Sequence, residues 1–291
     1  MQPSVHDIQP IFNGVQESLL ATPSLLSVFV PLSRDENPQS SNSAPASELD
    51  ISRISSYIQH IFPNPSVSGM GKWCYDCNTP MKDPTTMEIH GRTVAALSEP
   101  QTDDNRALLR FIVVVQILHQ LGHAICHHFN DLTTVIKLLP TFPVYVSNNF
   151  TKPYSHMEHG FWIEEALFGG IVGVMFDEHL DWLPPAFLSS DFTHISFLFL
   201  WCRDGRTYKL AVQDVKERLE SFRFIPFDVS KLEVVPIQHI NSRTCAMLLG
   251  DHFFMSNPGP GADKTAKDEL FERSYVSPLP ITRHFGVRDC K

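Results

Sequence analysis

The sequence lacks features that several broad classes of protein require. It has no run of eighteen apolar residues without a polar interruption, so we expect no membrane-spanning helix. Lys and Arg number 23 against 32 for Asp and Glu, which gives a net charge of −9, and no Lys/Arg run occurs. Because phosphate contacts need a basic face, we expect no nucleic-acid partner, and without a spanning helix we expect no membrane partner.

Several signatures of specific chemistry are also missing. The chain has no Gly-rich phosphate loop and no G-x-S-x-G elbow. Its six cysteines suggest no disulfide framework, and Cys74 and Cys77 lack the second ligand pair of a zinc knuckle. Residues 1–13 lack the basic stretch and apolar core of a secretory signal. We therefore expect an intracellular, cytoplasmic protein with reduced cysteines.

What the sequence does contain is enough apolar material for one large core. Of the 291 residues, 43% are hydrophobic and 21 are Phe. We predict a single α+β domain over residues 1–291. A Ser-, Asn- and Pro-rich flexible loop is predicted over 33–46, and an extended tail region over 258–291.

Apolar periodicity and turn residues predict the main elements. Helices are predicted at 48–62, 107–129, 159–168 and 213–222. Strands are predicted near 27–30, as a pair bent at Gly91 within 87–97, at 171–176, and as a hairpin of 192–201 with 207–212.

The most informative motif is His119-Gln120-Leu121-Gly122-His123, which lies within the long predicted helix. Histidines four residues apart share one helix face and can bind one metal ion. The spacing is that of the zinc-binding H-E-x-x-H motif, with glutamine in place of the glutamate that acts as general base. The extended form of that motif is absent, because Cys126 and Phe129 occupy the positions of its glycine and third histidine.

A third ligand for the metal must then come from elsewhere in the chain. The predicted helix at 159–168 carries Glu164 and Glu165, an acidic pair in an apolar segment that is costly to bury without a positive partner. Because these residues point about 100° apart, only one faces a given ion, and we prefer Glu164. The alternates are Glu158, His127 and His156. The competing interpretation is a structural helix whose histidines are satisfied without metal.

At these residues the chain resembles the zincin metallopeptidases, in particular the gluzincin arrangement of two helical histidines and a downstream glutamate. It is also similar to uncharacterised zincin-like proteins of fungi, which have H-E-L-G-H-A and a later Glu-bearing segment ending in Phe-Gly-Gly. The resemblance covers residues 111–176. It implies a buried motif helix packed on a mixed sheet, with a Glu-bearing second helix. It also implies a zinc cofactor, held by His119, His123 and Glu164, and a peptide or small amide substrate for a hydrolase.

Gln120 departs from that family pattern at the general-base position. Glutamine cannot accept a proton near neutral pH, and losing a general base commonly lowers a rate about 10²–10⁴-fold. Gln120 is therefore an inactivating substitution, the mark of a zinc-binding pseudoenzyme, or part of an altered enzyme that uses Glu165, Glu158 or His156 as its base. Two histidines and a carboxylate also suit iron, so a non-hydrolytic metalloenzyme is a further alternative.

Overall fold

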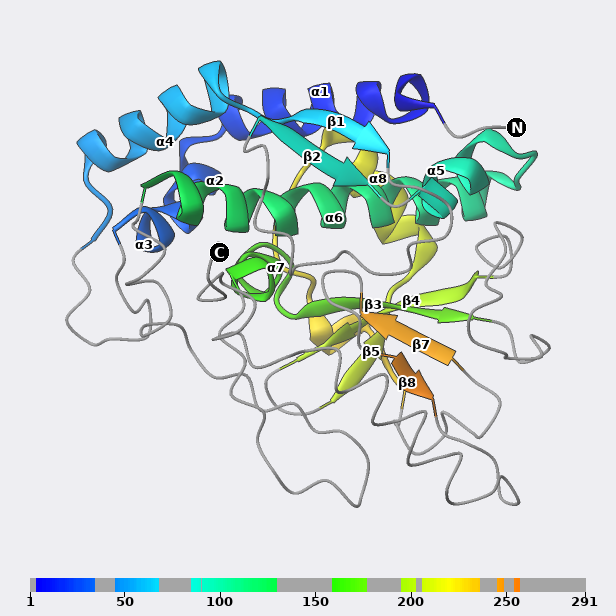
Figure 1. Cartoon of the computed structure of the whole chain (residues 1–291). Helices are drawn as coiled ribbons and strands as arrows, with labels where there is room; N and C mark the ends of the chain where they lie inside the picture. The colour runs from blue at the N-terminus through cyan, green and yellow to red at the C-terminus, as the bar shows by residue number, and fades with distance from the viewer. Residues whose placement is uncertain are drawn as a thin grey trace, which may run out of the picture.

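The structure, a computed structural model, describes residues 4–34, 45–67, 85–89, 91–129, 159–176, 195–202, 206–235, 245–248 and 254–256. It is an α+β arrangement in which helices and an antiparallel sheet form separate layers (Figure 1). The predicted loop over 33–46 falls mostly outside the described residues, and the predicted tail over 258–291 falls wholly outside them.

Helix α6 (Asp103–Phe129) is the central element and confirms the predicted motif helix, although it begins four residues earlier. Asp103 and Asp104 lie in its first turn, where acidic side chains favour the positive end of the helix dipole. The helix is long and apolar enough to cross a membrane, but 83% of its most apolar window is buried inside the protein. Extensive burial of this kind is typical of the core helix of a globular domain.

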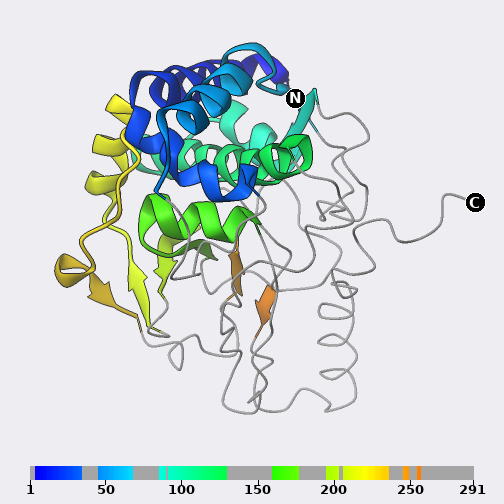
Figure 2. The same ribbon diagram turned by 90° about the vertical axis from the view of Figure 1, so that its left-hand side faces the viewer.

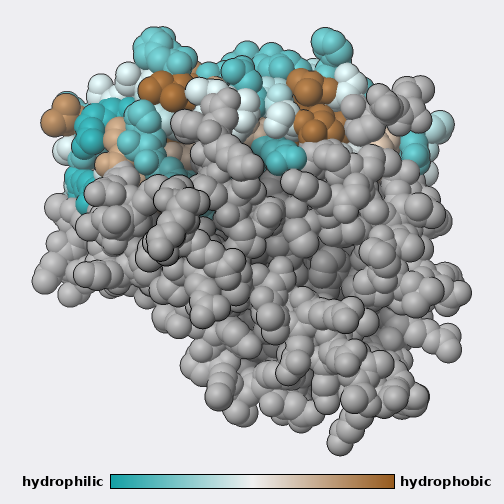
Figure 3. All heavy atoms as spheres, in the orientation of Figure 1, coloured by the Kyte–Doolittle hydropathy of each residue, from teal (hydrophilic) through white to brown (hydrophobic). Residues whose placement is uncertain are grey.

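Other helices cover α6 on the side away from the sheet (Figure 2). The surface over this helical layer is mainly hydrophilic in the view of Figure 3. Helix α7, by contrast, lies between α6 and the sheet and contacts both. The helices are α1 (Val5–Ala21), α2 (Pro23–Leu26), η1 (Ser27–Phe29), α3 (Val30–Ser33), α4 (Glu48–His60), α5 (Gly91–Ser98), α7 (His159–Phe168), α8 (Val212–Ser221) and η4 (Val229–Lys231).

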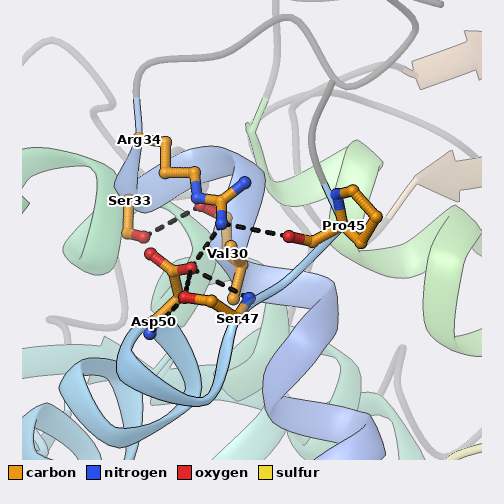
Figure 4. A network of polar contacts seen from close by, with 6 residues as sticks. All are labelled: Val30, Ser33, Arg34, Pro45, Ser47 and Asp50. Atoms are coloured by element: carbon orange, nitrogen blue, oxygen red, sulfur yellow. Dashed lines mark hydrogen bonds and ion pairs between the residues drawn. The ribbon is translucent and has the colours of Figure 1, made fainter. Parts of the chain in front are cut away.

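A polar network joins α3 to the start of α4 (Figure 4). The Arg34 guanidinium donates to the Asp50 carboxylate and to the carbonyl oxygen of Pro45, at 3.2 Å for the latter. Ser47 caps α4, and its backbone N–H donates to Asp50 at 3.0 Å in a capping box. Hydrogen bonds, first from Arg34 and then from Ser47, hold the pKa of Asp50 well below its ordinary value of 3.8.

In the part of the chain that the structure describes, the main sheet has six strands in the order β6-β5-β4-β3-β7-β8, and each of these pairings is antiparallel. The prediction of a mixed sheet was therefore wrong for this layer. A parallel pair does occur, but β1 and β2 form it separately, on the helical side. The strands are β1 (Asn64–Val67), β2 (Thr86–Ile89), β3 (Ile171–Phe176), β4 (Ile195–Trp201), β5 (Thr207–Lys209), β6 (Glu233–Val234), β7 (Cys245–Leu248) and β8 (Phe254–Ser256).

The predicted helices at 48–62, 159–168 and 213–222 are confirmed, as are the strand at 171–176 and the pairing of β4 with β5. Two strand predictions were wrong. Residues 27–30 are helical, because Pro23 and Pro31 open short helices in succession. Only residues 87–89 of the predicted 87–97 form a strand, and the chain becomes helix α5 at Gly91, where its apolar side chains are buried against α6.

Candidate metal centre

His119 lies on α6, which packs against α7, and none of its surface is exposed. Gly160, in the first turn of α7, faces the imidazole ring. A Cβ atom added at Gly160 would lie 2.2 Å from three atoms of that ring. Any side chain at this position would displace His119, so the missing side chain lets the backbone of α7 pack directly on the imidazole.

Glu164 lies one helical turn after Gly160 and is likewise fully buried. Its Oε1 is 2.7 Å from Nδ1 of His119, and its Oε2 accepts a hydrogen bond from the backbone N–H of Val172 at 2.8 Å. An ionised Glu164 carboxylate only accepts hydrogen bonds, and with Glu164 ionised Nδ1 of His119 is the donor. In the neutral ring, Nε2 then carries the lone pair.

That Nε2 faces the second histidine of the motif. The Nε2 atoms of His119 and His123 are 3.3 Å apart, and the ring centroids are 5.1 Å apart. A tetrahedral zinc ion with nitrogen ligands at about 2.0–2.1 Å holds two of them about 3.3–3.4 Å apart. The separation fits a hydrogen bond between the imidazoles, and it also matches the spacing of two nitrogen ligands of one ion.

The structure brings some of the other predicted site residues to this region. Gln120 is half-buried on α6, directly after His119, and Glu165 is half-buried on α7. His127 is half-buried one turn beyond His123, and burial, followed by the charge of His123, lowers its pKa to about 4. The alternates Glu158 and His156 lie outside the described residues.

The predicted third ligand does not converge with the two histidines in this arrangement. Glu164 binds the Nδ1 side of His119, whereas His123 faces the Nε2 side. Across the described ranges, no group of three or more His, Cys, Asp or Glu side chains is placed to hold one metal ion. The described residues therefore form a pair of imidazoles, with the Glu164 carboxylate on the Nδ1 side of His119.

The chain matches no family model, no curated protein and no solved structure. The description of the centre therefore depends on the geometry of its own residues, and the resemblance to zincins stays a prediction.

Three contributors to this region were not singled out from the sequence. Gly160 and Glu164 share a face of α7 through their spacing of four, a signal that the sequence does contain. The Val172 N–H becomes part of the site through the turn from α7 into β3, which contains Gly169 and Gly170. Gln116, one turn before Gln120, is 4% exposed, and its side-chain carbonyl has no hydrogen-bond partner among the described residues.

Proposed function

We propose that this protein binds one zinc ion through the Nε2 atoms of His119 and His123. The observation that carries the proposal is their separation of 3.3 Å within an apolar helix. Metal-bound histidines usually donate their other ring N–H to a carboxylate or carbonyl group, and His119 has such a partner in Glu164. Two imidazoles leave two of zinc's four positions for other donors.

The charge balance of the buried pair supports the same proposal. The Glu164 carboxylate and the His119 ring are both 0% exposed. The negative charge of an ionised Glu164 favours a dication bound on the far side of the His119 ring.

Gln120 sets the chemistry that we propose for the site. Bound zinc polarises a carbonyl or a water molecule, but hydrolysis also needs a group that takes a proton from the water. The amide of Gln120 forms hydrogen bonds and cannot take that proton. We therefore propose a zincin-like protein, related in design to metallopeptidases, that binds a peptide or small amide with little or no hydrolysis.

Zinc titration calorimetry tests the proposal. The chain is purified without added metal, treated with a chelator and titrated with zinc. We expect one site in the wild type, and affinity at least about 100-fold weaker in His119→Ala and in His123→Ala. His60→Ala is the control, because His60 is exposed at the end of α4. The proposal fails if the double variant His119→Ala/His123→Ala binds zinc as tightly as the wild type.

A further inference from the structure

We infer that Glu164 is a positioning residue rather than a zinc ligand. It holds His119 in the tautomer with the proton on Nδ1, which directs the Nε2 lone pair toward His123 and the metal. This inference rests on the proposed zinc site. It differs from the ligand role that the family resemblance implies for Glu164.

The first step is the direction from which the carboxylate approaches. Oε1 of Glu164 lies 2.7 Å from Nδ1 of His119. The lone-pair directions of Nδ1 and Nε2 diverge across an imidazole ring, so one oxygen cannot bind Nδ1 and also an ion on Nε2. The contact to His123 at 3.3 Å identifies the Nε2 side as the metal side.

The second step is the way in which the carboxylate is fixed. Its other oxygen accepts the backbone N–H of Val172 at 2.8 Å, at the start of β3. Turning Glu164 toward an ion on Nε2 would break both hydrogen bonds and leave two buried N–H groups without acceptors. At Gly160 the backbone of α7 lies against the face of the His119 ring, so the ring cannot move toward α7.

The third step is that only a carboxylate serves both donors. Val172 N–H and His119 Nδ1–H each need an oxygen acceptor. A glutamine offers one oxygen and one NH₂ group, so it satisfies one donor and opposes the other. If its oxygen stays on Val172, its NH₂ group faces Nδ1, and the His119 proton moves to Nε2, where it competes with the metal.

Nitrogen-15 NMR of histidine-labelled, zinc-free protein tests the inference directly, with His119 assigned by its loss in His119→Gln. In the wild type we expect Nδ1 protonated and Nε2 unprotonated. In Glu164→Gln we expect the Nε2–H tautomer to gain population and the zinc dissociation constant to rise about 10–100-fold. Glu220→Gln, which changes an exposed acid on α8, is the control, and we expect wild-type values for both.

Two results would overturn the inference. The first is a His119 ring that carries its proton on Nε2 in the wild type, a measurement that does not depend on the stability of any variant. The second is X-ray absorption of the zinc-loaded proteins in which Glu164→Gln loses a carboxylate oxygen from the zinc ligands. If the tautomer follows Glu164 but the wild type binds no zinc, the positioning role holds and the proposed function fails.

Discussion

Gln120 lies between the two histidines of α6 and carries an amide where a hydrolytic zinc site needs a carboxylate. The two side chains have nearly the same shape, so exchanging them changes the proton chemistry with little change in packing. At the scale of single residues, this position decides whether the proposed site can hydrolyse an amide or only bind one.

We predict that Gln120→Glu raises zinc-dependent peptide cleavage about 10²–10⁴-fold over the wild type, because it supplies the missing general base. The measurement is turnover of a quenched-fluorescent peptide library by the zinc-loaded proteins. Gln120→Met is the control, since it keeps the size without the acid. Equal inactivity of the wild type and Gln120→Glu, with zinc bound to both, would exclude a peptidase site.

Gln116, on α6, has a buried side-chain carbonyl without a hydrogen-bond partner among the described residues. An unsatisfied buried polar group costs about 1–3 kcal/mol. We predict that Gln116→Met, of similar size, raises the free energy of unfolding by about 1 kcal/mol in urea denaturation. A decrease of that size would show that the amide has a stabilising partner.

At the scale of elements, the backbone of α7 packs directly on the His119 ring of α6 because Gly160 has no side chain. We predict that Gly160→Ala lowers the free energy of unfolding by about 1–3 kcal/mol, the usual cost of overpacking a filled interior. The same change should cost less in a His119→Ala background, because the ring that it strikes is gone. Equal costs in both backgrounds, measured by urea denaturation, would contradict the packing described here.

The junction of α3 and α4 makes a separate prediction about pH. The folded-state pKa of Asp50 is lowered by Arg34 and Ser47, and the ordinary value for an unfolded chain is about 3.9. The carboxylate therefore contributes stability at pH values above about 4, and this contribution is lost as the pH falls below that value.

Asp50→Asn should consequently be less stable than the wild type at pH 7, and the difference should shrink as the pH falls from 5 to 2. Urea midpoints measured across that range check this. Asp228, whose pKa is lowered to about 2 mainly by Lys231, titrates in both proteins and cancels in the comparison. A difference that stays constant with pH would rule out the ionised Asp50 as the cause.

At the scale of the whole molecule, the sequence predicts local elements better than their relation in space. The periodicity of α6 and α7 and the histidine spacing follow from residues close together in the chain, and each is confirmed as local structure. The antiparallel sheet order includes the pairing of β3 with β7, whose residues lie about seventy positions apart, so no local pattern reports it.

Glu164 shows the same limit of sequence-based prediction at the site itself. The sequence identifies it as a buried acid facing the motif helix, and it does contact His119. Gly160 lets the backbone of α7 lie against the His119 ring, and in this packing Glu164 reaches Nδ1. A pattern of residue types does not contain this information. The sequence therefore does not predict that Glu164 lies on the Nδ1 side of His119.

X-ray absorption at the zinc edge tests the central claim most directly, since it reports the atoms bound to the metal. For the wild-type chain loaded with one equivalent of zinc, we predict two imidazole nitrogens at about 2.0–2.1 Å. We also predict that this imidazole signal is lost in His119→Ala/His123→Ala. A zinc environment without imidazole, or one unchanged in the double variant, would contradict the claim that His119 and His123 form a metal centre.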